Sequence, residues 1–251
     1  MVAIPPLLFA LLMWFIGTAT IVWLDSRPRR TFATSLWLVG FASIGAMVLV
    51  WAKAGDASAT AAYTGFAAAI VIWGWHEMSF LMGFVAGPNK AECPPDATGW
   101  RRFKLATATV IHHELAIAAT AILLFALTWG QPNQAAPLTF LLLFVLRLSA
   151  KFNLYLGVPN LSDEVFPAHL AYLKSYFRKA RLNPLFPFSI ILGCAIIAVA
   201  YDAHSVTGML IVGLAALGVV EHLFLVLPLR DAKMWRWAIS NDKAARAASN
   251  E

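Results

Sequence analysis

Seven long apolar runs, each closed by charged residues or by Pro and Gly, constrain the fold of this 251-residue chain more than any other feature. Runs of roughly 17–25 apolar residues can cross a bilayer as α-helices. The chain is 60% hydrophobic and 13% charged, whereas soluble domains have about 25% charged residues. The sequence therefore predicts an all-α, polytopic integral membrane protein that forms one transmembrane domain over residues 1–251. The predicted spans are residues 5–24, 31–52, 60–86, 104–129, 137–157, 186–201 and 205–229.

Lysine and arginine gather in alternate connections between these runs. They follow the first, third, fifth and seventh runs, and Lys53 alone follows the second. Because short cytoplasmic loops are enriched in basic residues, we expect a periplasmic N-terminus and a short cytoplasmic tail at 230–251. The same loops explain the formal net charge of +6 without nucleic acid, and we expect them to contact the lipid bilayer through anionic headgroups.

Ionisable side chains interrupt four of the runs at a similar predicted depth. At ~1.5 Å rise per residue they lie roughly 10–15 Å below the cytoplasmic surface. An ionisable group in hydrocarbon costs at least ~2.5–3.5 kcal/mol, so these groups need partners, and we expect them to form one buried cluster. The members are His76, Glu77, His112, His113, Glu114, Arg147, Lys151, Glu221 and His222.

Helical spacing predicts which side chains share a face. Arg147 and Lys151 are four residues apart and share one. His112 and His113 point ~100° apart, so one can ligate while the other braces it. Small residues also mark faces where membrane helices approach closely. Those on the predicted side of His76 are Gly65, Ala69, Gly83 and Gly87, and Gly218 precedes His222 by four positions.

Three interpretations of the cluster are open. Imidazole and carboxylate together suit iron, zinc or manganese, and the predicted metal ligands are His76, Glu77, His112, His113, Glu114, Glu221 and His222. Imidazole alone suits the central metal of a tetrapyrrole, with His76, His112, His113 and His222 as predicted cofactor-binding residues. In the third, Arg147 and Lys151 pair with the three glutamates in a purely structural network that keeps a net charge of −1.

Other motifs restrict the enzyme classes. The cluster has no HExxH pattern, which argues against a zincin-type protease, and no Glu-x-x-His pairs of soluble di-iron bundles. Cys93 and Cys194 provide neither a disulfide framework nor a CxxC metal motif. An enzyme built on the cluster would be a metal-dependent oxidoreductase or hydrolase, and the sequence singles out no catalytic residue.

Residues 160–182 form a separate amphipathic segment. Ser162 can cap a helix that continues to about Lys179. Phe166, Leu170, Leu173 and Phe177 recur on one face, and His169 lies on the same helix. The pattern predicts an amphipathic helix at the cytoplasmic membrane interface.

Four stretches resemble the PuhE-type photosynthetic complex assembly proteins of purple phototrophic bacteria. They are WHEMSFLMGFVAGP at 75–88, NLYLGVPN at 153–160, PAHLAYLKSYF at 167–177 and NPLFP at 183–187. The resemblance implies an inner or intracytoplasmic membrane location. It also implies a role in assembling reaction-centre and light-harvesting complexes, with their subunits and pigment-synthesis proteins as partners. We therefore expect a non-enzymatic assembly factor that holds a metal or a bacteriochlorophyll-type pigment, and a metal-dependent membrane enzyme is the alternative.

Overall fold

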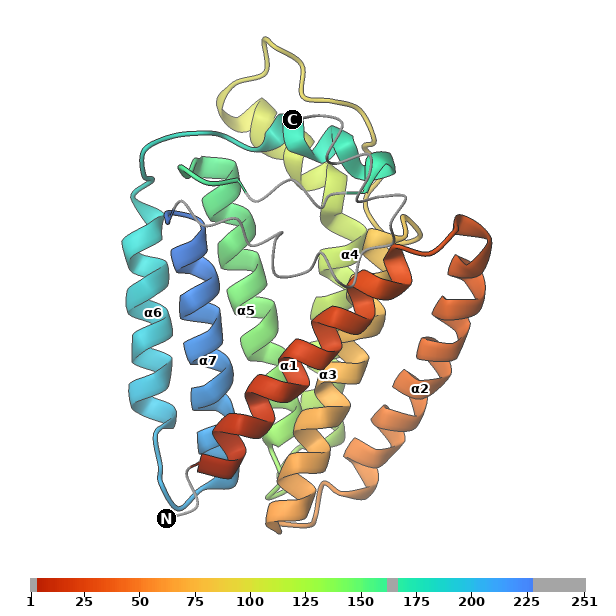
Figure 1. Cartoon of the computed structure of the whole chain (residues 1–251), viewed down its shortest axis with the longest axis vertical. Helices are drawn as coiled ribbons and strands as arrows, with labels where there is room; N and C mark the ends of the chain where they lie inside the picture. The colour runs from red at the N-terminus through yellow and green to blue at the C-terminus, as the bar shows by residue number, and fades with distance from the viewer. Residues whose placement is uncertain (1–3, 162–166, 228–251) are drawn as a thin grey trace.

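Helices make up most of the described part of the chain, residues 4–161 and 167–227, in this computed structural model (Figure 1). In chain order they are α1 (Ile4–Asp25), the 3-10 helix η1 (Arg29–Thr31), α2 (Phe32–Ala52), α3 (Ala59–Leu81), α4 (Gly99–Leu127), α5 (Ala135–Leu156), the 3-10 helix η2 (Ala168–Tyr176), α6 (Leu185–Ala200) and α7 (Val206–Phe224). Within these residues there is no strand, only an isolated bridge between Val158 and Lys179. The all-α prediction is confirmed.

Five helical segments are long and apolar enough to cross a membrane: α1, Arg29–Ala52, α4, α5 and α7. The chain therefore has the helices of a multi-pass membrane protein. The 16 residues of α6 reach about 24 Å, less than the ~30 Å of a hydrocarbon core. Crossing by α3 and α6, and hence a total of seven spans, stays a prediction.

The central helix of the bundle is α3, which packs against α1, α2, α5 and α7. A Cβ added to Gly65 would lie 3.3 Å from the Cβ of Ala135 on α5, so this small residue does mark a close helix contact. Next along the same interface, the rings of Trp73 and Phe140 meet edge to face with centroids 5.5 Å apart. Its interior position explains why α3 is rich in small residues and can carry His76 and Glu77.

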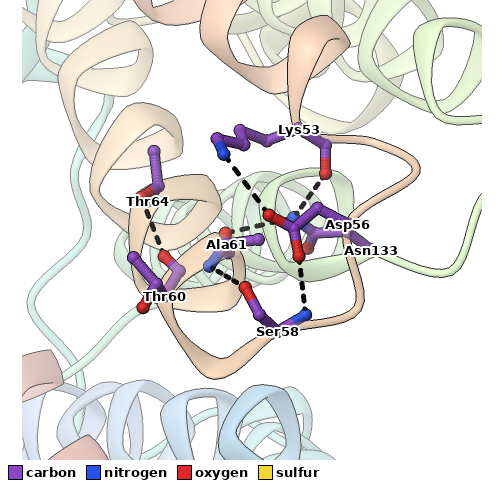
Figure 2. A network of polar contacts seen from close by, with 7 residues as sticks. All are labelled: Lys53, Asp56, Ser58, Thr60, Ala61, Thr64 and Asn133. Carbon is purple, nitrogen blue, oxygen red and sulfur yellow. Dashed lines mark hydrogen bonds and ion pairs between the residues drawn. The ribbon is translucent and has the colours of Figure 1, made fainter.

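Hydrogen bonds close the end of the bundle where α2 turns into α3 (Figure 2). The Lys53 ammonium lies 3.3 Å from Asp56, and the Ser58 hydroxyl caps α3 by accepting from the Ala61 amide. From the α4–α5 connection, the Asn133 amide group donates to the carbonyl oxygens of Lys53 and Ala61. Hydrogen bonds from Ser58, with a smaller contribution from Lys53, hold the pKa of Asp56 below its ordinary value.

The opposite end of the bundle carries the basic connections. Figure 1 places η1, the α3–α4 loop and η2 together there, away from the α2–α3 turn that holds Lys53. The alternation predicted from lysine and arginine is therefore matched by the helix directions. The predicted tail, residues 230–251, lies outside the described residues, and which end faces the cytoplasm stays a prediction.

The predicted third span ends earlier than expected. The sequence predicts a span over 60–86, but α3 ends at Leu81 because Gly83 adopts a φ of +81°, which L-residues with a side chain rarely adopt. Gly83 and Gly87 therefore lie in a turn and not on a helix face with His76. A Cβ on Gly87 would overlap the backbone of Ala108 and Thr109, so this glycine lets the turn lie directly against α4.

The predicted amphipathic helix also differs from the structure. Among its described residues only Ala168–Tyr176 are helical, as the 3-10 helix η2, while Ser162 and Phe166 lie outside the described residues. Leu170 and Leu173 are 2% and 4% exposed and pack with Phe80 and Ala86. The prediction that this stripe faces lipid is therefore wrong for these two residues, because α3 and the turn after it supply the apolar surface that buries them.

Candidate functional site

Two ion pairs link three helices at the level of the predicted cluster. Arg147 Nη2 on α5 donates to Glu77 Oε2 on α3 over 3.0 Å. One turn further along α5, the Lys151 ammonium pairs with Glu114 Oε1 on α4. Arg147 and Lys151 thus share a face, as their spacing predicts, and each meets a glutamate from a different helix.

His113 lies between these pairs and is completely buried. Its ring stacks on Phe80 with centroids 4.6 Å apart, and the Lys151 ammonium lies 5.5 Å from the centroid of the same phenyl ring. His113 Nε2 is 3.8 Å from Glu77 Oε1, which is close but beyond a hydrogen bond. Neither ring nitrogen of His113 has a hydrogen-bond partner in the described part of the chain.

His76 takes a different direction from Glu77, its neighbour on α3. Its Nε2 is 2.9 Å from the Thr120 hydroxyl of α4, and its ring meets Phe140 edge to face at 5.9 Å. Thr120 lies six positions after Glu114 on α4. His76 therefore joins α3 to α4 and α5 without joining the ion pairs.

His222 belongs to a second, neutral network between α5, α6 and α7. Its Nδ1 donates to the Gly218 carbonyl over 2.8 Å, and its Nε2 lies 3.0 Å from the Ser149 hydroxyl. The Ser149 hydroxyl lies 2.9 Å from that of Ser189. A Cβ on Gly218 would overlap Leu146 of α5, so the predicted small-residue contact beside His222 is present.

The other two predicted residues, His112 and Glu221, are exposed. His112 is exposed on α4 while His113 is buried, which agrees with the ~100° that separates neighbouring helix positions. Glu221 is exposed on α7. The four histidines of the prediction thus point to four different environments.

A cavity of about 490 Å³ lies between α4, α5, α7 and η2. Four predicted cluster residues border it, and they are the charged ones: Glu114, Arg147, Lys151 and Glu221. None of the four predicted histidines does. The aromatic lining residues are Phe80, Phe103, Phe152, Tyr155, Tyr176, Phe177 and Phe224. The arrangement is an apolar, aromatic chamber with balanced charges in its wall.

Arg102 fastens η2 to the helices that border this cavity. Its guanidinium donates to the carbonyl oxygens of Tyr155 and Tyr176 and lies 4.2 Å from the centroid of the Tyr155 ring. Arg102 is not among the residues predicted from the sequence, because its partners are 53 and 74 positions away. Phe80 is not among them either, although it follows Glu77 by three positions and helical spacing places it on the same side of α3.

The predicted metal site is not assembled as proposed. Within the described ranges, no three His, Cys, Asp or Glu side chains form a group that could hold a metal ion. The physical reason is that Thr120 and Ser149 draw His76 and His222 to different helices, while His112 faces outward. Buried atoms that have no hydrogen-bond partner in the described part remain at the ion pairs, on Glu77 Oε1 and Glu114 Oε2.

The chain is similar to known sequences over nearly its whole length. A family model described as a protein of unknown function (DUF3623) matches residues 1–246. The chain belongs to this family. It is 37% identical over 248 residues to a protein of Rhodobacter capsulatus described as an uncharacterized 30.4 kDa protein in the puhA 5'region, covering 92% of this chain and 89% of that protein. No solved structure matches the chain.

Proposed function

We propose that this protein is a non-enzymatic membrane factor for the assembly of photosynthetic reaction-centre and light-harvesting complexes. The observation that carries the proposal is the similarity to the Rhodobacter capsulatus protein described as lying in the puhA 5' region, which agrees with the resemblance of four stretches to PuhE-type photosynthetic complex assembly proteins. The match extends over nearly the whole of both chains and is therefore not confined to a short motif. The proposed partners are reaction-centre or light-harvesting subunits and pigment-synthesis proteins.

We further propose that the cavity bordered by α4, α5 and α7 holds a bacteriochlorophyll-type pigment during this process. Its volume of about 490 Å³ falls in the range of ~300–1,000 Å³ of ligand pockets, and its wall combines aromatic rings with a few charged groups. Arg147 and Lys151 can donate to carbonyl groups on the rim of such a ring. This moves the proposed pigment contacts from the four histidines to the cavity walls.

We also propose a bacterial inner membrane location with the basic end of the bundle in the cytoplasm. The support is the excess of lysine and arginine at the end that holds η1 and η2. A topology reporter fused after Ala247 is expected to be active in the cytoplasm, and one inserted in residues 55–58 in the periplasm. The reverse pattern contradicts the orientation and leaves the cavity proposal intact.

The decisive experiment is an absorption spectrum with elemental analysis of the protein purified from a phototrophic host. We expect Soret and Qy bands that co-purify with the chain. Ala106→Phe fills the cavity from α4 and is expected to remove the bands. Ala119→Phe, on an exposed position of the same helix, is the matched control and should keep them.

Two other outcomes contradict the pigment proposal. Stoichiometric iron or zinc without pigment bands would favour the metal-dependent enzyme considered from the sequence. Protein that carries neither metal nor pigment, with both variants equally stable, would favour a purely structural role for the charged residues.

A further inference from the structure

A second pocket, of about 400 Å³, lies at the basic end of the bundle. It forms where the start of α2, the turn after α3 and η2 meet, and it shares no lining residue with the cavity described above. Its apolar wall includes Phe32, Met82 and Leu170, and Phe84 beside them is 58% exposed. An exposed phenyl ring next to an apolar pocket at a helix end is suited to lipid contact.

Two cations line the same pocket from separate parts of the chain. Arg29 comes from η1 and Lys90 from the α3–α4 loop, and both are exposed. No carboxylate lines the pocket, and within the described ranges neither residue forms an ion pair. The pocket therefore carries two positive charges that the described protein does not neutralise.

The Tyr172 hydroxyl provides an independent indication of a ligand. Tyr172 is one of the residues that line this pocket, and its hydroxyl oxygen is buried without a hydrogen-bond partner in the part of the chain that the structure describes. A buried hydroxyl without a partner costs about 1–3 kcal/mol, so an acceptor atom supplied by a ligand would stabilise it. Burial also raises the pKa of Tyr172, so the phenol remains a donor at neutral pH.

The opposite wall of the pocket is fixed in place by close packing. His169 Nε2 donates to the Leu81 carbonyl at the end of α3 over 2.8 Å. Gly83, with its φ of +81°, lies so near that an added Cβ would be 2.9 Å from the imidazole. The pocket is thus held between η2 and the turn after α3.

We propose that this pocket binds the phosphate group of an anionic phospholipid. Arg29 and Lys90 neutralise the phosphate, the Tyr172 hydroxyl donates to one of its oxygens, and an acyl chain lies along Phe84. A free phosphate ion would contact the two cations but not the apolar wall. A phospholipid would contact the cations through its phosphate and the apolar wall through an acyl chain. The position at the ends of membrane-spanning segments places the site at headgroup level.

The test measures lipid binding to the purified full chain in neutral detergent by native mass spectrometry, with phosphatidylglycerol and phosphatidylcholine as probes. Replacing both cations, Arg29→Gln with Lys90→Gln, is expected to weaken phosphatidylglycerol binding on the order of 10- to 30-fold. Tyr172→Phe, which removes only the hydroxyl, should weaken it severalfold. Binding of phosphatidylcholine should be weak in every variant.

The matched control removes the same charge from the same end of the molecule, Lys179→Gln with Arg181→Gln. Both residues are exposed and neither lines the pocket. We expect this control to bind phosphatidylglycerol like the unmodified chain. An equal loss in the control would mean general surface attraction and overturn the site. Displacement of the lipid by equimolar inorganic phosphate would also overturn it in favour of a free-phosphate site.

Discussion

The two polar networks on either side of α5 have opposite characters. Arg147 and Lys151 form ion pairs with α3 and α4, while Ser149 and Asn153 form neutral hydrogen bonds with α6 and α7. Residues two positions apart on a helix point ~200° apart, so α5 presents the two networks on opposite faces. The positions of the two networks on opposite sides of α5 therefore follow from residue spacing along this one helix.

The networks differ in how completely they close. In the neutral network, Asn183 donates to Asn153 Oδ1 and to the Gly157 carbonyl, and Asn153 donates to Ser189, so its members satisfy one another. The charged network borders the cavity and leaves Glu77 Oε1 and Glu114 Oε2 without hydrogen-bond partners in the described residues. A closed buried network stabilises the packing of its helices, whereas an open one beside a cavity is suited to a ligand.

The largest effect should come from breaking the charged network at Arg147→Met. This change leaves Glu77, whose side chain is 8% exposed, without its cation, and we expect a loss of about 3–5 kcal/mol in the free energy of unfolding. Glu77→Gln should cost less, because Arg147 is 43% exposed and keeps contact with the cavity. Denaturant unfolding of the solubilised protein measures both.

The double variant Arg147→Met with Glu77→Gln sharpens this result. It should recover a large part of the loss, because neither partner remains as an unpaired charge. Asp56→Asn at the exposed Lys53 pair is the control and should change stability little. Additive losses in the double variant would show that the pair is not coupled.

An intermediate effect is expected from the neutral network at Asn153→Ala. The change removes the acceptor of Asn183 and two donated hydrogen bonds, and we expect a loss of about 1–3 kcal/mol. Pigment content, if the proposed function holds, should be unchanged in the folded fraction. Loss of pigment at full stability would mean that the two networks are not separable in the way their geometry indicates.

The smallest effect should follow from His112→Ala. Its side chain is exposed, so the free energy of unfolding should change by less than about 0.5 kcal/mol. His113→Ala is the informative neighbour, since it removes a completely buried ring that stacks on Phe80. Thermal unfolding of the two variants side by side would contradict the assignment of faces if His112→Ala were the more damaging change.

Much of the candidate site could be predicted from helical spacing. The shared face of Arg147 and Lys151, the divergence of His112 from His113 and the close contact at Gly218 all follow from ~3.6 residues per turn. The end of α3 was misplaced because the apolar run continues to Ala86, and apolarity alone does not distinguish a buried turn from a helix. For η2, the sequence predicts the apolar stripe that includes Leu170 and Leu173, but it does not predict that this stripe packs against Phe80 and Ala86.

The sequence by itself determined that this chain is helical, that it is built for a membrane and that its ionisable residues must find partners. The tertiary structure decided which partners they are. Arg147 reaches Glu77 across 70 residues of chain, and His222 reaches Ser149 across 73. Periodicity fixes the direction of a side chain relative to its own helix, but the choice of partner depends on how separate helices pack. The division into a closed neutral network and an open charged one exists only once those helices are together.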